Sequence, residues 1–182
     1  MKRSFIEKVL KYNIGQHDSE ISGVSIDSRN LKKGELFVAV PGKQIDGHMF
    51  VKEALDKGAA AVLVSQDVGL KSNRLIRVAD TTKALGQIAS AWRDEFDPLL
   101  IGITGSNGKT TVKELTLQVL TDRFGKDQVL GTIGNLNNHL GVPLTLLRLC
   151  PTHRYAVVEM GMNHPYEIAY LSHLAKPDIA LV

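Results

Sequence analysis

Short apolar runs separated by polar, glycine-containing segments fill the first 80 residues. Runs rich in β-branched and other apolar side chains predict strands at residues 21–28, 35–40, 60–64 and 75–78. Apolar positions at helical spacing predict helices at residues 5–10 and 49–57, the second of which ends before Gly58. We therefore expect residues 1–80 to form a small α/β domain.

From residue 81 onward the pattern becomes a regular alternation of apolar strands and helices. A helix that begins after Asp80 is separated by Pro98 from the strand that follows. Strands are predicted at residues 99–103, 128–133, 155–160 and 178–182, and helices at residues 109–123, 141–149 and 165–175. This alternation is typical of a parallel sheet with helices on its faces. Because the chain ends inside its last apolar strand, we expect residues 81–182 to be a truncated α/β domain with a mostly parallel sheet.

An apolar strand leads directly into a glycine-containing loop and then into a helix. The loop and the helix start consist of Thr104, Gly105, Ser106, Asn107, Gly108, Lys109, Thr110 and Thr111. Glycines let backbone N–H groups turn toward an anion, Lys109 can reach the β- and γ-phosphates of ATP, and Thr110 can ligate magnesium. The strict pattern has Gly where this chain has Ile103, so the match is to a variant. A glycine-rich turn with an incidental Lys and Thr is the alternative, but the order of strand, loop and helix favours phosphate binding.

A carboxylate near the magnesium ion is the second requirement of this chemistry. Glu159 follows the apolar residues 156–158 at the end of a predicted strand, and we predict that Thr110 and Glu159 hold the metal. A solvated strand end would be the default interpretation of an isolated Glu. The phosphate loop makes the metal-binding interpretation the better one.

Two further polar segments are candidates for the same site. Residues 135–139 form an Asn-rich cluster between apolar elements, and such a cluster can line a site or can cap its own backbone. Within it, Asn138 and His139 are second-rank candidates. His164 stands just before Pro165 at a predicted helix start, where it can face the reacting groups or simply lie in a loop.

Composition narrows the class of protein. The net charge of +3 comes from 22 basic and 19 acidic residues spread along the chain, so no basic arm for nucleic acid is present. The single cysteine, Cys150, cannot form an internal disulfide and follows an apolar run, so we expect a buried thiol and a reducing, cytoplasmic location. No stretch approaches the roughly 20 apolar residues of a membrane span.

Several segments together resemble the Mur ligase family. The segments that resemble its central ATP-binding domain are residues 104–111, 134–145 and 159–165. Those that resemble its uridine-nucleotide-binding domain are residues 27–29, 34–39, 42 and 46–50. In the second group, the resemblance implies that Ser28, Arg29, Asp46 and His48 bind the uridine substrate. Asp27 and Arg29 can equally form a structural ion pair.

The resemblance implies an ATP-dependent amide ligase of peptidoglycan precursor synthesis. The terminal carboxylate of UDP-N-acetylmuramoyl-tripeptide would attack the γ-phosphate of ATP, and the amine of D-alanyl-D-alanine would attack the resulting acyl phosphate. Lys109 and a magnesium ion held by Thr110 and Glu159 fit the need to neutralise two repelling anions. The resemblance also places residues 135–139 beside the phosphates and the metal. We expect a monomer that acts on small molecules and is neither bound to nucleic acid nor embedded in a membrane.

Two departures from the family pattern qualify this expectation. Members of the family are more than twice as long, so we expect this chain to be inactive by itself. Tyr166 stands where the family commonly has Gly, which the helix start should tolerate with local crowding. The alternatives are a tripeptide-forming or folyl-polyglutamate type of ligase and, from a different class, a non-catalytic nucleotide-binding remnant.

Overall fold

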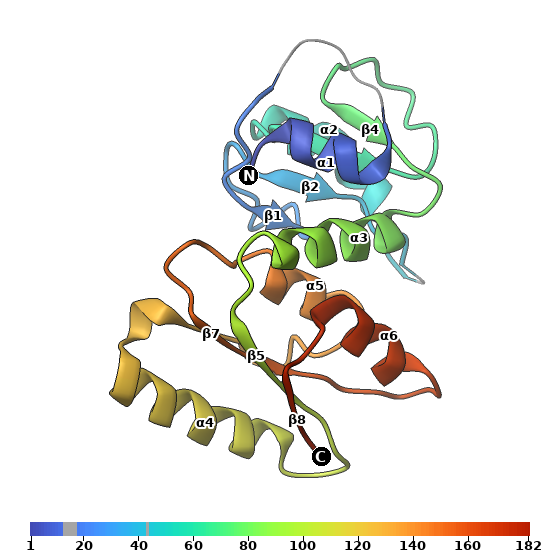
Figure 1. The fold of residues 1–182 in the computed structure, drawn as a ribbon. Coiled ribbons are helices and arrows are strands. Elements are labelled where there is room, and N and C mark those ends of the chain that lie inside the picture. Colours follow the sequence, from blue (N-terminus) through green and yellow to red (C-terminus); the bar gives the residue numbers. More distant parts are fainter. Residues whose placement is uncertain (13–17, 43) are drawn as a thin grey trace. The chain divides into compact units, whose positions relative to one another are not determined.

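The structure is a computed structural model that describes residues 1–12, 18–42 and 44–182 (Figure 1). The chain divides into two compact units, Met1–Ile88 and Ala89–Val182. The division falls inside helix α3, Thr81–Asp94, whereas the sequence placed it near residue 80, where this helix begins. Thr81 Oγ1 donates to the carbonyl of Ala39 in the first unit at 2.8 Å. In the second unit, Trp92 Nε1 donates to the carbonyl of Leu149 at 3.1 Å.

The first unit contains a four-stranded parallel sheet in the order β1-β2-β3-β4. Its strands are β1 Val24–Ser25, β2 Leu36–Val38, β3 Ala61–Val64 and β4 Leu75–Arg77. Its further helices are α1 Arg3–Leu10, the 3-10 helix η1 Gly47–Phe50 and α2 Val51–Asp56. Every residue of β2 and β3 is buried, as expected for continuous apolar runs in a parallel sheet that is covered on both faces.

The second unit contains a four-stranded parallel sheet in the order β6-β7-β5-β8. Its strands are β5 Leu99–Ile103, β6 Val129–Gly131, β7 Tyr155–Glu159 and β8 Ile179–Leu181. Its helices are α4 Lys109–Phe124, the 3-10 helix η2 Lys126–Gln128, α5 Gly141–Leu146 and α6 Glu167–Ala175. The mixed α/β fold with parallel sheets that the sequence predicted is confirmed.

Alternating side chains of the central strands β5 and β7 build two cores on opposite faces of this sheet. Ile101 and Val157 pack with Leu117 and Leu120 of α4. Leu100, Ala156 and Val158 belong to the other core, together with buried residues of α5 and α6. Successive residues of a strand point to opposite faces, so the same two strands bind α4 on one side and α5 and α6 on the other (Figure 1).

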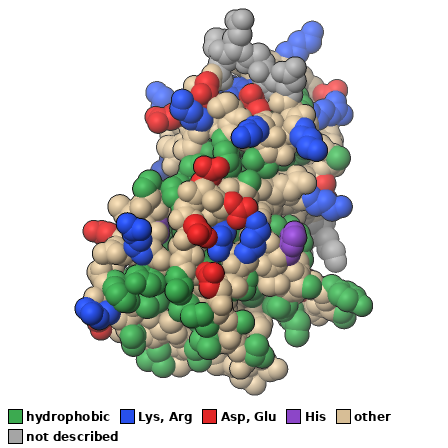
Figure 2. Space-filling view, viewed as in Figure 1, with side chains coloured by type: hydrophobic (Ala, Val, Ile, Leu, Met, Phe, Trp, Pro, Cys, Tyr) green, Lys and Arg blue, Asp and Glu red, His purple; other side chains and the backbone are tan. Residues whose placement is uncertain are grey.

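Helix α4 also carries apolar side chains on its outer face. Leu115 is 62% exposed and Val119 is 66% exposed, and Figure 2 shows hydrophobic side chains gathered over this helix. Among the described residues, no helix has both the length and the apolar character needed to cross a membrane.

The expectation of a buried cysteine is wrong. Helix α5 ends at Leu146, three residues before the predicted end at residue 149, and Cys150 lies after it, only partly buried. Its Sγ lies 3.2 Å from His153 Nδ1 and 3.2 Å from Thr152 Oγ1. The neighbouring Leu149 is buried in the core, whereas the thiol of Cys150 contacts polar atoms.

Candidate functional site

The predicted phosphate loop connects the end of β5 to the start of α4. Gly108 has a φ of +77°, a left-handed conformation that glycine adopts without steric cost, and it directly precedes the helix. The first turn of α4 therefore points its free N–H groups into the loop, which is the geometry that favours an anion. Lys109 Nζ donates to the carbonyl of Gly105 at 2.7 Å, so the ammonium group folds back over the loop.

Glu159 ends strand β7, which pairs with β5 in parallel so that Glu159 lies beside Ile103. Glu159 is buried, with 1% of the residue exposed, and is not the solvated strand end that an isolated Glu would suggest. Thr110 Oγ1 donates to Oε2 at 3.1 Å, and Asn137 Nδ2 donates to Oε1 at 2.8 Å. The structure thus brings the two predicted metal ligands into contact from different elements, at the edge of the sheet where the phosphate loop begins.

The donor set suits magnesium. Thr110 and Glu159 offer a hydroxyl and a carboxylate oxygen, which are the hard ligands that Mg²⁺ prefers, and Mg²⁺ usually completes its shell with phosphates and water. The portion of the chain described by the structure holds no group of three or more His, Cys, Asp and Glu side chains that could bind a metal by themselves. The hydroxyl of Thr110 and the carboxylate of Glu159 lie together beside the predicted phosphate loop.

Lys113 lies one helical turn after Lys109 and was missed by the sequence analysis. Its side chain is 0% exposed, and its Nζ lies 3.9 Å from Glu159 Oε2. Nζ donates to the carbonyls of Thr132 and Gly134, each at 3.2 Å. The spacing of four residues from the phosphate-loop lysine places both side chains on one face of α4, and this spacing was the signal available in the sequence.

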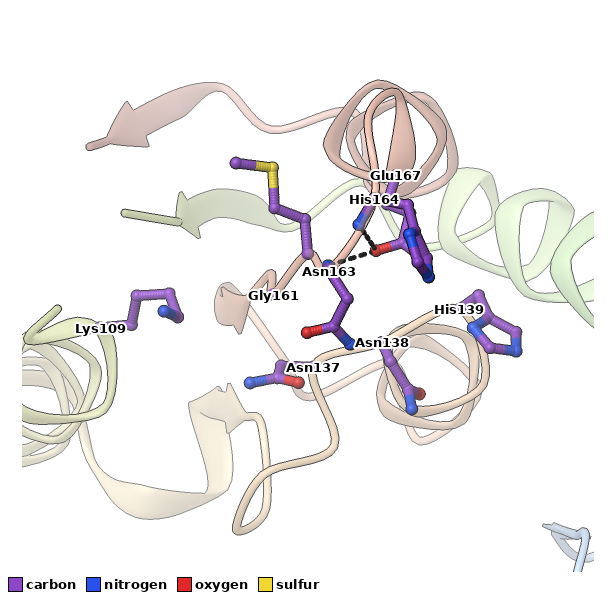
Figure 3. Close-up of a pocket in the computed structure, with 9 residues that line it drawn as sticks. Lys109, Asn137, Asn138, His139, Gly161, Asn163, His164 and Glu167 are labelled. Atoms are coloured by element: carbon purple, nitrogen blue, oxygen red, sulfur yellow. Dashed lines mark hydrogen bonds between the residues drawn. The ribbon is translucent and has the colours of Figure 1, made fainter. Parts of the chain in front are cut away.

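A cavity of about 390 Å³ opens beside Lys109 (Figure 3). It is lined by Lys109, Asn137, Asn138, His139, Gly161, Met162, Asn163, His164 and Glu167. Figure 3 shows Lys109 on one side of this cavity and His139, His164 and Glu167 together on the other. The phosphate loop, the Asn-rich segment and the segment after β7 thus meet at one cavity.

Within the Asn-rich segment the structure separates two roles. Asn138 Oδ1 accepts hydrogen bonds from the backbone N–H groups of Leu140 and Gly141, at 3.0 and 2.9 Å, so this oxygen caps the backbone at the start of α5. Asn137, which was not singled out, bonds Glu159. A β-carbon at Gly161 would lie 2.9 Å from Asn137 Oδ1, so a larger residue at this position would push the Asn137 side chain away from its place beside Glu159.

The far side of the cavity is shaped by Glu167, another residue that the sequence analysis missed. Glu167 Oε2 accepts the backbone N–H groups of Asn163 and His164 at 2.6 and 3.1 Å. These hydrogen bonds stabilise the charged carboxylate and lower the pKa of Glu167 below its usual value of 4.5. An acidic residue in the first turn of a helix is the capping signal that could have identified it. The segment that carries His164 is thereby held to the start of α6.

Tyr166 directly precedes α6 with a φ of +70°, a left-handed conformation that disfavours a side chain. The ring is 87% exposed, so the local crowding that we expected is absent. The energetic cost of Tyr instead of Gly at position 166 is therefore strain in the left-handed backbone conformation.

In the first unit, the candidate substrate residues follow the carboxyl ends of β1 and β2, which are neighbours in a parallel sheet. Arg29 is 85% exposed and forms a two-pronged ion pair with Asp27, whose Oδ2 lies 2.7 Å from Nη2. This guanidinium lowers the pKa of Asp27 to about 2. Ser28 is buried, and its Oγ donates to Glu53 at 3.2 Å. The ion pair that was an alternative for Asp27 and Arg29 is therefore present, and the guanidinium remains accessible.

Asp46 and His48 lie at the start of η1. The Nδ1 of His48 is 2.6 Å from Asp46 Oδ1, and its Nε2 accepts the backbone N–H of Ser65 at 2.9 Å. Because Nε2 accepts, the ring proton sits on Nδ1 and points at Asp46. The backbone N–H and the ring of His48 together lower the pKa of Asp46. Both ring nitrogens of the buried His48 thus have partners within the unit, and its contact with Asp46 is the one that reaches the surface.

A loop that joins a strand to a helix, a lysine and a threonine at the helix start, and a buried carboxylate on the neighbouring parallel strand define a phosphate-loop nucleotide-binding fold. Comparison with known families identifies which one. The Mur ligase middle domain matches residues 103–182, and the catalytic domain of the Mur ligase family matches residues 20–93. The chain belongs to the Mur ligase family.

Two similar proteins of known function carry the same name. UDP-N-acetylmuramoyl-tripeptide--D-alanyl-D-alanine ligase of Escherichia coli (strain K12) is 41% identical over 179 residues, which cover 98% of this chain and 39% of that protein. The ligase of the same name from Buchnera aphidicola subsp. Baizongia pistaciae is 45% identical over 91% of this chain and 36% of its own length. The chain therefore spans about two fifths of the length of these relatives.

Solved structures agree with this relationship. MurF from Acinetobacter baumannii superposes with a TM-score of 0.84 at 36% identity, covering 97% of this chain and 39% of that one. MurF ligase from Thermotoga maritima, solved in complex with ADP, superposes with a TM-score of 0.76 at 36% identity, covering 86% of this chain and 36% of that one.

Proposed function

We propose that the chain is the front part of an ATP-dependent ligase that adds D-alanyl-D-alanine to UDP-N-acetylmuramoyl-tripeptide. The observation that carries the proposal is the contact of Thr110 Oγ1 with Glu159 Oε2, at 3.1 Å, directly behind the phosphate loop. Relatives named for this reaction support the choice of substrates. Since those relatives are longer, the reaction requires the whole ligase, and we expect residues 1–182 by themselves to be inactive.

The phosphate loop has to solve an electrostatic problem. A substrate carboxylate that approaches a triphosphate is repelled unless positive charge faces both anions. The free N–H groups at the start of α4 supply fixed partial charge, and Lys109 supplies a full one. In the structure Lys109 bonds the neutral carbonyl of Gly105. A phosphate is a stronger partner for an ammonium group, so Lys109 would turn from the loop carbonyl toward the γ-phosphate.

Thr110 and Glu159 would hold magnesium. When bound, the ion would neutralise phosphate charge and orient the group being transferred. Glu159 is already directed by Asn137 on one oxygen and by Thr110 on the other. Ligands that are held before the ion arrives lose little freedom on binding, which favours a defined metal position.

The cavity beyond Lys109 is where we place the reacting carboxylate. It lies between the phosphate loop and the segment of His139 and His164. Both imidazoles are on the accessible side and can donate to an anionic oxygen. Asn138 would contribute mainly by fixing the backbone of this segment, since its oxygen caps α5.

The first unit would bind the uridine end of the substrate at the carboxyl edge of its sheet. Arg29 presents an exposed guanidinium, which fits a diphosphate. Ser28 and Asp46 follow neighbouring strands at that edge and would contact the uracil or the ribose, and His48 would act through its bond to Asp46. We further propose a monomer that works in the cytoplasm on small molecules and binds no nucleic acid.

A chimera tests this proposal. Residues 1–182 replace the matching segment of the Escherichia coli relative, and formation of the ligated product is followed with the uridine substrate, ATP and D-alanyl-D-alanine. We expect ligation that requires all three compounds and magnesium. A folded chimera that does not ligate, while the parent enzyme does so under the same conditions, would overturn the proposed function.

A further inference from the structure

We propose that Lys113 is a positioning residue of the phosphate and metal site, which ties three separate segments together from within the core. This inference deepens the proposed function and rests on it for the role of the site. The geometry that carries it is the position of a fully buried ammonium group among oxygens of α4, of the segment after β6 and of the end of β7.

A fully buried lysine is rare, because an ammonium group loses its hydration unless protein oxygens replace it. Three oxygens lie within 3.2 Å of Lys113 Nζ: Glu114 Oε1 at 2.9 Å and the carbonyls of Thr132 and Gly134 at 3.2 Å. An ammonium group has three N–H donors, so each donor has a partner. Protein oxygens thus surround the ammonium group where water is excluded.

The two carbonyls belong to the segment that leads into the Asn-rich cluster. Asn137 follows it and reaches Glu159 Oε1 with its side chain, while its backbone carbonyl accepts the N–H of Gly161 at 2.8 Å. Holding the carbonyls of Thr132 and Gly134 against α4 therefore sets where Asn137 can lie. The two carbonyls lie five and three residues before Asn137. Lys113 thus acts on Glu159 indirectly, by fixing the backbone that carries Asn137.

Lys113 also faces Glu159 without blocking it. The distance of 3.9 Å from Nζ to Oε2 is longer than a hydrogen bond, so both carboxylate oxygens remain directed by Thr110 and Asn137. Glu114, at 2.9 Å on the outer side, offsets the charge of the ammonium group. Because Lys113 does not line the cavity, it does not touch the phosphates, and its effect is on the arrangement of the groups that do.

The test compares Lys113→Met with the unmodified 182-residue chain. Met has an unbranched side chain of similar length to that of Lys but lacks the ammonium group and its three N–H donors. Lys126→Met is the matched control, because it removes the same charge from an exposed position just after α4. The first readout is amide hydrogen exchange at Thr132, Asn137 and Gly161, whose N–H groups are bonded in or to this segment. It needs no ligand.

We expect exchange at these amides to rise about tenfold in Lys113→Met and to stay unchanged in Lys126→Met, with the exchange of strand β5 unaltered in both. The second readout is binding of inorganic tripolyphosphate with and without Mg²⁺. In Lys113→Met, the increase in tripolyphosphate affinity caused by Mg²⁺ should be about tenfold smaller, while the affinity without Mg²⁺ should be unchanged. A general loss of stability would lower both affinities. Lys126→Met should preserve the gain.

A folded Lys113→Met chain with unchanged exchange and an unchanged magnesium gain would overturn the proposal. If Lys113→Met does not fold, Lys113→Gln, whose amide can still donate to one carbonyl, is compared in its place. Loss of folding in both variants would show a general core role and would equally overturn it. If the unmodified chain binds no tripolyphosphate, the proposed function fails at the phosphate loop, while the exchange readout still decides the role of Lys113.

Discussion

In both units, charged candidate residues lie at or after the carboxyl ends of parallel strands, but the charged groups have different surroundings. In the first unit, Arg29 pairs with Asp27 two residues away, in an exposed turn. In the second unit, Glu159 is buried and bonds Thr110 and Asn137, which lie 49 and 22 residues away. One arrangement is local and hydrated, and the other joins distant elements inside the protein.

This difference bears on how each site meets its ligand. An exposed ion pair contributes little stability, so Arg29 can exchange Asp27 for a phosphate at low cost. A buried and fully bonded carboxylate is costly to disturb and keeps its direction before any ligand arrives. Under the proposed function, binding energy in the first unit would come mainly from contacts made on binding, whereas the second unit would be organised in advance for its chemistry.

The largest expected effect is at the phosphate loop. In the chimera, Lys109→Ala should lower turnover by about 10³-fold or more, because the lysine faces charge that shifts during phosphoryl transfer. Binding of the uridine substrate, which we assign to the first unit, should barely change. Steady-state kinetics and calorimetry separate the two effects. Near-normal turnover would contradict the role of the loop.

Glu159→Ala should have a smaller effect of a different kind. Its loss acts through magnesium, so turnover should fall by about 10²-fold and recover in part when the magnesium concentration is raised. Lys109→Ala should show no such recovery. Magnesium titrations of the two variants in the chimera provide the measurement, and identical titration curves for both would argue against Glu159 as a metal ligand.

Two arginines extend the comparison to stability. Arg93 is almost fully buried and donates to the carbonyls of Ala175 and Lys176 at the end of α6, each at 3.1 Å. Arg93→Ala should lower the free energy of unfolding by about 2–4 kcal/mol, because it leaves the buried carbonyl of Ala175 and the partly buried carbonyl of Lys176 without this donor. Arg29→Ala should change it by less than about 0.5 kcal/mol. Denaturant unfolding of both variants provides the values, and equal losses would remove the distinction between the two regions.

The smallest expected effect is the acid titration of Asp27. Its pKa is lowered from 3.8 to about 2, chiefly by the side chain of Arg29, so the pair stabilises the fold above pH 3.8 and loses this contribution as the pH falls through about 2. In Arg29→Ala, the midpoint should return toward 3.8. The carboxyl resonance of Asp27 can be followed by NMR, and a midpoint that does not move would show that Arg29 is not the cause.

The order of elements and the phosphate loop could be predicted from sequence because both depend on local patterns. Continuous apolar runs identify buried parallel strands, and Gly108 followed by Lys109 identifies a loop that leads into a helix. The early end of α5 was missed, and with it the partial exposure of Cys150. An apolar run does not by itself show where helical backbone bonding stops.

The residues that organise the site were harder to find. Lys113 stands between Val112 and Glu114 in a helix of mixed polar and apolar residues, and nothing in these neighbours shows that its ammonium group reaches carbonyls 19 and 21 residues away. Asn137 and Asn138 are adjacent and chemically identical, yet one bonds Glu159 and the other caps α5. Which of them faces the site depends on backbone direction, which only the folded structure defines.

The most direct test of the central claim is NMR mapping of tripolyphosphate with Mg²⁺ on the ¹⁵N-labelled chain. The account predicts shifts at the amides of the phosphate loop, residues 104–111, together with residues 132–139 and 159–164, and a weaker response at Glu159 when Mg²⁺ is omitted. Shifts confined to the first unit, or none at the phosphate loop at saturating ligand, would contradict the account.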